Sequence, residues 1–157
     1  MENPNKHGGN DLRYRDDLHV GQRFVSGTHR VDEEQIKSFA KQFDPQPFHL
    51  DSEAAKGTVF QGLAASGWHT AAITMRLLVE SLPIAGGIVG AGGEITWPKA
   101  TRPEDNLHVE SEIVELRPSR SRPDRGIATI RCETRNQSGE TVQALIAQLV
   151  LPRKVVG

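Results

Sequence analysis

The sequence of 157 residues has almost no cysteine and no dominant charge. Cys132 is the only cysteine, so an intramolecular disulfide is impossible and a zinc site built on paired cysteines is excluded. Because Cys132 lies in an alternating apolar stretch, we expect a buried, inert thiol. The formal net charge is −1, which gives no reason to expect a nucleic acid or an anionic membrane as partner.

Long apolar runs are also missing. The longest is too short and too interrupted to cross a bilayer, and residues 1–10 are polar, unlike a signal peptide or a membrane anchor. We therefore expect a cytoplasmic protein without a membrane partner. The length suits a single domain that needs no disulfide or structural metal. Residues 1–16 are predicted to form a flexible tail, and residues 17–157 a single domain.

Two helices are predicted. The first begins after Asp32, a favourable N-cap residue with Gln35 in the capping-box position. It should end at Asp44, because Pro45 disfavours helical backbone there. The second helix should cover residues 67–82, and its apolar character on nearly every side is typical of a buried helix. The apolar stripe of the first helix has the spacing of a helix face: Ile36, Phe39, Ala40 and Phe43.

The C-terminal half consists of predicted strands. Asn136 to Gly139 is a hairpin turn signal, and an arginine-rich loop from Arg117 to Arg125 joins two earlier strands. One buried helix followed by an antiparallel meander predicts an α+β fold, with a curved antiparallel sheet wrapped around a long central helix. The four segments that alternate or run apolar are residues 87–97, 106–116, 126–135 and 140–151.

The segment Asp44-Pro45-Gln46-Pro47-Phe48-His49 is the first candidate site, and we expect it to be a loop. Its two prolines restrict the loop, so the Asp44 carboxylate and the His49 imidazole can be held in a fixed relation. Such a pair can orient one water and move its protons, since histidine titrates near neutrality. The spacing alone also fits a helix-terminal aspartate beside a surface or capping histidine.

The start of the second helix, Ala65-Ser66-Gly67-Trp68-His69, is the second candidate site. The first turn of a helix has N–H groups without a partner in the helix and carries the positive end of the dipole. The Gly67 N–H is therefore suited to bind a thioester oxygen, as an oxyanion hole does. The alternative is that Ser66 is a simple N-cap and that Gly67 permits close packing against the sheet.

Cofactor and metal sites have little support. A metal site from His49, Asp51 and His69 has suitable residue types, but no ligand spacing such as HxxxH supports it. The glycines of residues 86–93 do not form G-x-G-x-x-G followed by a helix, so a dinucleotide site is not expected. We interpret these glycines as bends or bulges in a curved sheet, and we expect neither a metal nor a cofactor.

Together these segments resemble the MaoC-like dehydratase family, which includes (R)-specific enoyl-CoA hydratases. The resemblance covers residues 21–152, and the family's Asp-x-Asn-Pro-x-His motif corresponds to residues 44–49. An Asp-x-Glu-x-Ala segment follows at residues 51–55, and residues 97–105 resemble a strand-Pro-x-x-x-Gly-Asp passage. Three residues depart from the family pattern: Gln46 replaces Asn, Ser66 replaces His, and Glu104 replaces Gly.

The resemblance implies a hot-dog fold, a homodimer, and hydration of a trans-2-enoyl thioester or the reverse dehydration. It implies that Asp44 and His49 hold the water and that the Gly67 N–H binds the thioester oxygen. Coenzyme A or acyl carrier protein would carry the acyl group, with no separate cofactor. The residues expected to line the substrate site are Gln46, Ser66 and Trp68.

Two other functions fit the same scaffold. A hot-dog acyl-CoA thioesterase would use a carboxylate to direct water at the carbonyl itself, but such enzymes usually lack the Asp-x-x-Pro-x-His loop. A non-catalytic protein that binds acyl thioesters is the second alternative, because a fold does not fix a function. The retention of Asp44, His49 and Gly67 favours the hydratase.

The arginine-rich loop suggests a contact with the nucleotide of coenzyme A. Guanidinium groups bind phosphate oxygens in a bidentate manner, so Arg120 and Arg122 are candidates for holding the phosphates. The simpler interpretation, which we favour, is a solvated hairpin loop whose charges serve solubility.

Overall fold

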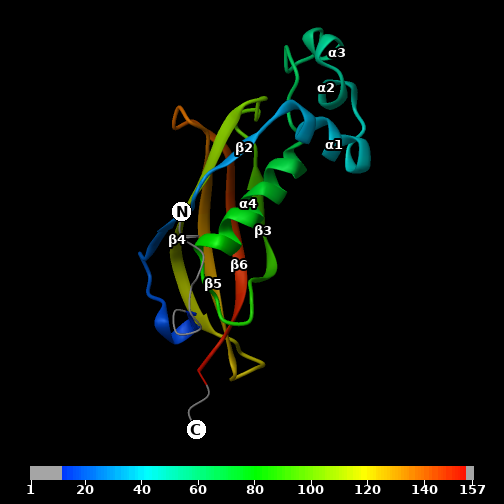
Figure 1. The fold of residues 1–157 in the computed structure, drawn as a ribbon. Helices are drawn as coiled ribbons and strands as arrows, with labels where there is room; N and C mark the ends of the chain where they lie inside the picture. The colour runs from blue at the N-terminus through cyan, green and yellow to red at the C-terminus, as the bar shows by residue number, and fades with distance from the viewer. Residues whose placement is uncertain (1–11, 155–157) are drawn as a thin grey trace.

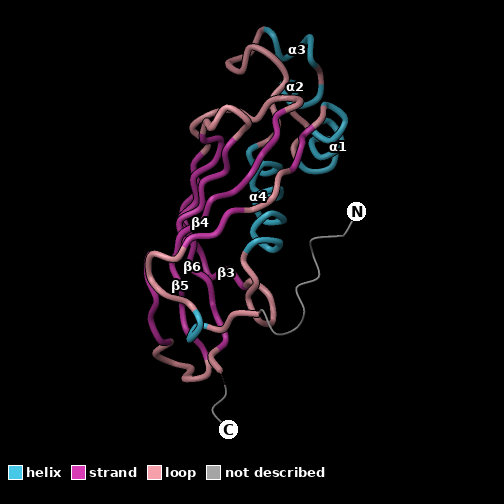
Figure 2. The backbone as a smooth tube through the Cα atoms, turned by 60° about the vertical axis from the view of Figure 1, so that its left-hand side comes forward, coloured by secondary structure: helices cyan, strands magenta, loops and turns pink. Residues whose placement is uncertain are grey.

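The computed structural model describes residues 12–154. A curved antiparallel sheet forms one layer, and the long helix α4 (Gly67–Ser81) lies along one face of it (Figure 1). The short helices α1, α2 and α3 gather at one end of the sheet, and Figure 2 shows the same arrangement from another side. The predicted α+β architecture is therefore confirmed. Within the described residues, no helix is long and apolar enough to span a bilayer.

The sheet has six strands, and all strand pairs are antiparallel. Five of them follow the order β1-β4-β5-β6-β3, while β2 also pairs with β4. The ends of the four predicted strands agree with the structure within two residues. The strands are β1 (Arg23–Val25), β2 (His29–Val31), β3 (Val89–Thr96), β4 (Asp105–Pro118), β5 (Arg125–Arg135) and β6 (Thr141–Pro152).

Strand β3 is an edge strand, and almost all of its residues are exposed. Its pairing with β6 shifts register between Gly90 and Gly92, which confirms the interpretation of these glycines as part of a bulge. A Cβ on Gly93 would clash with the Ile146 carbonyl oxygen of β6, so only glycine permits this close approach of the two strands.

Helix α1 (Glu33–Phe43) begins and ends where the sequence predicts. The Asp32 side chain accepts a hydrogen bond from the Gln35 N–H at 2.8 Å, and Val31 and Ile36 are both buried beside this cap. The apolar stripe is only partly buried, because Phe43 at its C-terminal end is 70% exposed.

The predicted loop from Asp44 to Asp51 contains one turn of helix, α2 (Pro47–Leu50). Pro47 occupies its first position, where a missing N–H costs nothing and the fixed φ favours helical backbone. Asp51 then caps α3 (Ser52–Lys56), accepting hydrogen bonds from the N–H groups of Glu53 and Ala54. His49 consequently lies in a helical turn rather than in an irregular loop.

Helix α4 is buried on one face only, which corrects the expectation of burial on every side. Two threonines of α4 point inward: Thr70 hydrogen-bonds Thr101, in the segment before β4, at 2.9 Å, and Thr74 hydrogen-bonds Thr134 of β5 at 2.6 Å. The opposite face carries large apolar side chains that are 41–61% exposed, namely Trp68, Met75 and Val79. In a single chain, the apolar side chains on this outer face of α4 are therefore largely exposed to solvent.

The hydrophobic core lies between α4 and the sheet. Alternate residues of β4 and β5 point inward, as a strand period of two requires. Cys132 is 1% exposed, which confirms the expected burial, and this burial raises the pKa of its thiol to about 12. The core residues of these three elements are Ile73, Leu77, Leu78, Leu107, Val109, Ile113, Ala128, Ile130 and Cys132.

The predicted N-terminal tail lies mostly outside the described residues, but its last part is held by the fold. Arg13 donates a backbone hydrogen bond to the Pro83 carbonyl at 2.7 Å and accepts one from the Ala85 N–H at 2.8 Å. Asp17, in the following 3-10 turn, forms an ion pair with Lys154 at 2.9 Å. The folded part of the chain therefore begins before residue 17.

Candidate active site

Asp44 and His49 lie together at the end of the sheet where α1, α2 and α3 gather. Asp44 is the residue that ends α1, and His49 lies in the single turn of α2. The His49 Nε2 atom is 3.3 Å from Oδ2 of Asp44. His49 is only 4% exposed, so the pair faces little bulk water. The structure thus brings the two predicted catalytic residues into direct contact.

The other nitrogen of His49 determines which side of the ring carries the proton. Nδ1 lies 2.6 Å from the carbonyl oxygen of Ala64, and a carbonyl can only accept. Nδ1 must therefore be the N–H donor in the neutral ring, which leaves a free lone pair on Nε2. Nε2 is the atom that faces Asp44, so it can take up a proton there and afterwards release it.

The Asp44 carboxylate is held in its ionised form. Burial by itself raises the pKa of this carboxyl group, but interactions with the Gln46 amide, the Ser66 hydroxyl and His49 outweigh that effect. The net result is a pKa below the ordinary value. Gln46, which is predicted to contact the substrate, donates from its side-chain amide to Oδ1 of Asp44 and so orients this carboxylate.

Gly67 begins α4, as the sequence predicts. Ser66 is the N-cap, and its hydroxyl accepts a hydrogen bond from the Trp68 N–H at 3.3 Å. The Gly67 N–H has no hydrogen-bond partner among residues 12–154, so it is available to an external oxygen. Close packing is also required here, because a Cβ on Gly67 would lie 2.7 Å from the indole of Trp97.

A hollow of about 260 Å³ contains both the histidine and the helix terminus. His49 and Gly67 lie in its wall with the small or apolar side chains of Phe60, Ala65 and Trp97. Lys99 lies at the exposed part of the wall and pairs with Glu140. The hollow is therefore mostly apolar and has a few polar groups at defined places, which is typical of a small-molecule site.

Trp97 is the wall residue that sequence reasoning missed. Its indole N–H donates to Oε1 of the buried Gln143 at 2.9 Å, which holds the ring against Gly67. The available signal was a tryptophan beside Pro98 at the end of a predicted strand, but nothing local indicates which helix it meets. Trp68, a predicted substrate residue, lies outside the hollow, 61% exposed and packed edge-on against Trp97 at 5.2 Å.

The arginine loop lies far from the catalytic pair within one chain. Arg120 and Arg122 follow Pro118, at one end of β4, whereas the candidate site adjoins Asp105 at the other end (Figure 1). The 14 residues of β4 span about 45 Å. The structure therefore does not bring these two arginines to the site within one chain. Their position agrees with the simpler interpretation of a surface loop.

The three residues considered as metal ligands, His49, Asp51 and His69, each interact with different groups. The His49 ring is engaged by Ala64 and Asp44, while the Asp51 carboxylate caps α3. His69 stacks on Phe39 with ring centroids 4.6 Å apart. Burial, together with the nearby His29, lowers the pKa of His69 to about 4. Within the described part of the chain, no group of three or more such side chains converges on a metal position.

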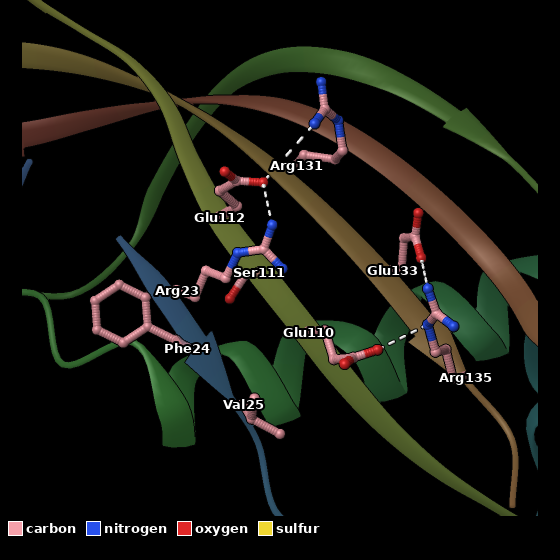
Figure 3. Close-up of a pocket in the computed structure, with 9 residues that line it drawn as sticks. All are labelled: Arg23, Phe24, Val25, Glu110, Ser111, Glu112, Arg131, Glu133 and Arg135. Atoms are coloured by element: carbon pink, nitrogen blue, oxygen red, sulfur yellow. Dashed lines mark hydrogen bonds and ion pairs between the residues drawn. The ribbon is translucent and has the colours of Figure 1, made fainter. Parts of the chain in front are cut away.

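A second hollow, of about 350 Å³, lies on the face of the sheet turned away from α4 (Figure 3). Its charged side chains pair with one another: Glu112 lies between Arg23 at 3.6 Å and Arg131 at 3.8 Å. Arg135 lies 2.7 Å from Glu110 and also pairs with Glu133. Since three arginines meet three glutamates, no charge is left for a ligand, and we do not assign a site here.

Known proteins resemble this chain in both sequence and fold. Residues 11–135 match the family model described as MaoC like domain. The uncharacterized protein YdeM of Bacillus subtilis (strain 168) is 35% identical over 125 residues, covering 78% of this chain and 86% of YdeM. A MaoC-like dehydratase structure from Rhodospirillum rubrum is 57% identical with a TM-score of 0.89, covering 92% of this chain and 99% of that one.

A more distant structure also carries functional information. The (R)-hydratase from A. caviae involved in PHA biosynthesis is 27% identical with a TM-score of 0.71, covering 86% of this chain and 98% of that one. The resemblance expected from the residues 44–49 motif and from the start of the long helix is thus confirmed. The chain belongs to the MaoC-like domain family and has its hot-dog fold.

Proposed function

We propose that this protein is a hydratase/dehydratase that adds water to, or removes it from, a trans-2-enoyl thioester. The observation that supports this best is the contact between His49 Nε2 and Asp44 at 3.3 Å beside the free N–H of Gly67. The first two groups are suited to proton transfer, and the third to binding a developing negative charge on a carbonyl oxygen. The family membership supports the same class of reaction.

In this mechanism, the Gly67 N–H and the positive end of α4 bind the thioester oxygen, which lowers the energy of the enolate form. A water held between Asp44 and His49 gives one proton to Nε2 of His49 as its oxygen bonds to C3 and the electrons of the double bond move onto the thioester oxygen. The pair then delivers that same proton to C2, either from Nε2 or through Asp44 across the 3.3 Å contact. The elements of water are thus added across the double bond, and the pair returns to its starting state.

The mechanism needs no metal or redox group, and the carrier of the acyl group is part of the substrate. We propose coenzyme A or acyl carrier protein in this role. The aromatic rings of Phe48 and Phe60 pack beside His49, with Phe48 at 4.5 Å, and offer an apolar surface to the acyl group. Ser66 remains a proposed contact of the site through its position between Asp44 and the helix terminus.

A panel of trans-2-enoyl-CoA esters of increasing chain length tests the function. Hydration removes the absorbance of the conjugated thioester without releasing a thiol. A thioesterase would instead release free coenzyme A, which a thiol reagent detects in the same samples. Loss of absorbance without thiol supports the hydratase, thiol release supports the thioesterase, and binding without turnover supports a non-catalytic acyl-thioester protein.

We also propose that the protein works as a homodimer joined through β3 and the uncovered face of α4. An exposed edge strand invites pairing, and the exposed side chains of Trp68, Met75 and Val79 form an apolar stripe beside it. Light scattering should therefore give twice the mass of one chain. Val79→Lys should weaken the dimer, whereas Val25→Lys at the opposite edge should not, although Val25 is 66% exposed. A monomer at micromolar concentration would contradict the proposal.

A further inference from the structure

The segment between α3 and α4 forms part of the catalytic site through its backbone. The Ala64 carbonyl accepts the hydrogen bond from His49 Nδ1, and the Phe60 side chain lies in the wall of the hollow. Residues 57–62 of this segment are exposed or half-buried, whereas residues 63–66 are buried, and Gln61 adopts a left-handed φ of 56°. A non-glycine residue in this conformation is held by its surroundings, since the conformation itself costs about 1 kcal/mol.

Arg102 provides much of that support. Its guanidinium donates to three backbone carbonyls of the segment: to Gly62 at 3.0 Å, to Leu63 at 3.2 Å, and to Phe60. These carbonyls lie on both sides of the left-handed Gln61. Only the planar, five-donor head of arginine can reach several carbonyls at once in fixed directions, and the point charge of a lysine cannot.

The contacts continue from Arg102 to the imidazole of His49. A peptide unit is planar, so fixing its N–H also fixes the direction of its carbonyl. The Leu63–Ala64 peptide is held by Arg102 on its oxygen and by the Phe48 carbonyl on its N–H at 3.1 Å. The next peptide donates from Ala65 N–H to the Thr101 carbonyl at 2.9 Å and presents the Ala64 oxygen to His49. Residues 101 and 102 thus hold both peptides that surround Ala64.

We propose that Arg102 is a positioning residue for His49: it fixes the segment of residues 60–64 so that the Ala64 carbonyl keeps the imidazole in its Nδ1–H tautomer. Without this support, the Ala64 carbonyl moves and the ring is free to place its proton on Nε2. A neutral ring protonated on Nε2 cannot accept a proton from the water. The catalytic part of this proposal rests on the hydratase function proposed above, whereas the tautomer part does not.

Nitrogen-15 correlation spectra of the histidine rings test the proposal directly, with the His49 signals assigned from a His49→Gln variant. We expect neutral His49 to be the Nδ1–H tautomer in the natural protein. In Arg102→Met we expect a mixture with the Nε2–H tautomer, together with a fall in kcat of about tenfold to a hundredfold and little change in KM. Arg102→Lys should show the same effects more weakly, because it keeps the charge and the stem but not the planar head.

Arg30→Met is the matched control, because within the described part of the chain the Arg30 guanidinium bonds the exposed carboxylate of Glu104 and no carbonyl of the segment. It should leave both the tautomer and kcat unchanged. If Arg102→Met fails to fold, Arg102→Lys provides the same two readouts. An unchanged His49 tautomer in the folded Arg102 variants, with only a lower unfolding temperature, would overturn the proposal. If no enoyl thioester is turned over, the function fails, but the tautomer still decides the role of Arg102.

Discussion

The two hollows on opposite faces of the sheet use polar side chains in different ways. On the outer face, three arginines and three glutamates pair with one another, either between adjacent strands or, for Glu133 and Arg135, along β5 (Figure 3). On the face toward α4, the hollow has few polar groups, and these converge on a common space from α2 and from the start of α4. Nε2 of His49 and the N–H of Gly67 both have capacity for a further partner.

The difference shows that the amount of charge in a hollow says little about its function. The outer hollow is larger, about 350 Å³ against about 260 Å³, and has many more ionised groups. Its groups satisfy each other, as exposed cross-strand pairs commonly do. A site is better indicated by groups whose hydrogen-bonding capacity is incomplete and whose orientation is fixed by neighbours, as Ala64 fixes His49.

The largest expected effect comes from the proposed catalytic pair, Asp44 and His49. Asp44→Asn and His49→Gln should each lower kcat/KM for an enoyl-CoA ester by about 10²–10⁴, because each removes a proton-transfer group. Glu133→Gln, in the outer hollow, should change kcat/KM less than twofold, since among residues 12–154 the Glu133 carboxylate forms an ion pair with Arg135 alone. Steady-state kinetics with circular dichroism on all three variants decide this. Activity near that of the natural protein in both pair variants would refute the assignment.

A smaller but still large effect is expected at Gly67. In Gly67→Ala the new methyl group would lie 2.7 Å from the Trp97 indole, so the ring or the helix terminus must move. We expect a loss of about 1–3 kcal/mol in the free energy of unfolding from overpacking, with a fall in kcat of about 10²-fold from a displaced N–H.

Gly57→Ala is the matched control for Gly67→Ala, because a Cβ on Gly57 meets nothing within 4 Å. It should leave both unfolding and kcat nearly unchanged. The double variant Gly67→Ala with Trp97→Leu should recover part of the stability, because the smaller side chain makes room. No recovery would mean that the clash with Trp97 is not the cause.

The sequence predicted those features that depend on neighbouring residues. The cap at Asp32, the end of α1 before Pro45 and the approximate strand ends follow from local patterns, and the structure confirms them. Asp44 and His49 could be proposed for the same reason, because they are only five positions apart in a segment stiffened by prolines. Their contact is set by one short stretch of chain.

The features that the sequence did not predict depend on contacts between distant segments. Trp97 reaches Gln143 across 46 positions, and Thr74 reaches Thr134 across 60, so no local pattern could place them. The same holds for Arg102, whose three carbonyl acceptors lie about 40 positions earlier. Arg120 was proposed only because its loop is rich in arginine. Strand β4 places this loop at the end of the sheet away from the candidate site.

His69 is another buried polar group without a complete set of partners, and we expect it to make the stability of the fold depend on pH. Its Nδ1 is buried without a partner among the described residues, and burial lowers its pKa from 6.5 to about 4. Between these two values, the unfolded chain binds a proton that the folded chain does not. The free energy of unfolding must therefore fall as the pH drops from 6.5 toward 4, by about 2–3 kcal/mol for this group.

Denaturant unfolding of the natural protein and of His69→Phe at several pH values tests this expectation. Phenylalanine keeps the stack on Phe39 but cannot titrate, so the variant should lose less stability over the same pH interval. Other titrating groups contribute equally to both proteins and cancel in the difference. Parallel curves for the two proteins would show that His69 is not the group responsible.

The smallest effects should come from the outer hollow. Glu112 pairs with both Arg23 and Arg131 on neighbouring strands, yet the two arginine side chains are 77% and 53% exposed, so water and salt screen the attraction. Glu112→Gln should lower the free energy of unfolding by about 0–1 kcal/mol at low ionic strength and by less at high salt. Glu115→Gln, on the same strand, is the control for removing a negative charge that makes no ion pair within residues 12–154. If Glu112→Gln instead lowered kcat/KM as strongly as Asp44→Asn, the outer hollow would have to be counted as part of the site, and the contrast between the two faces of the sheet would be wrong.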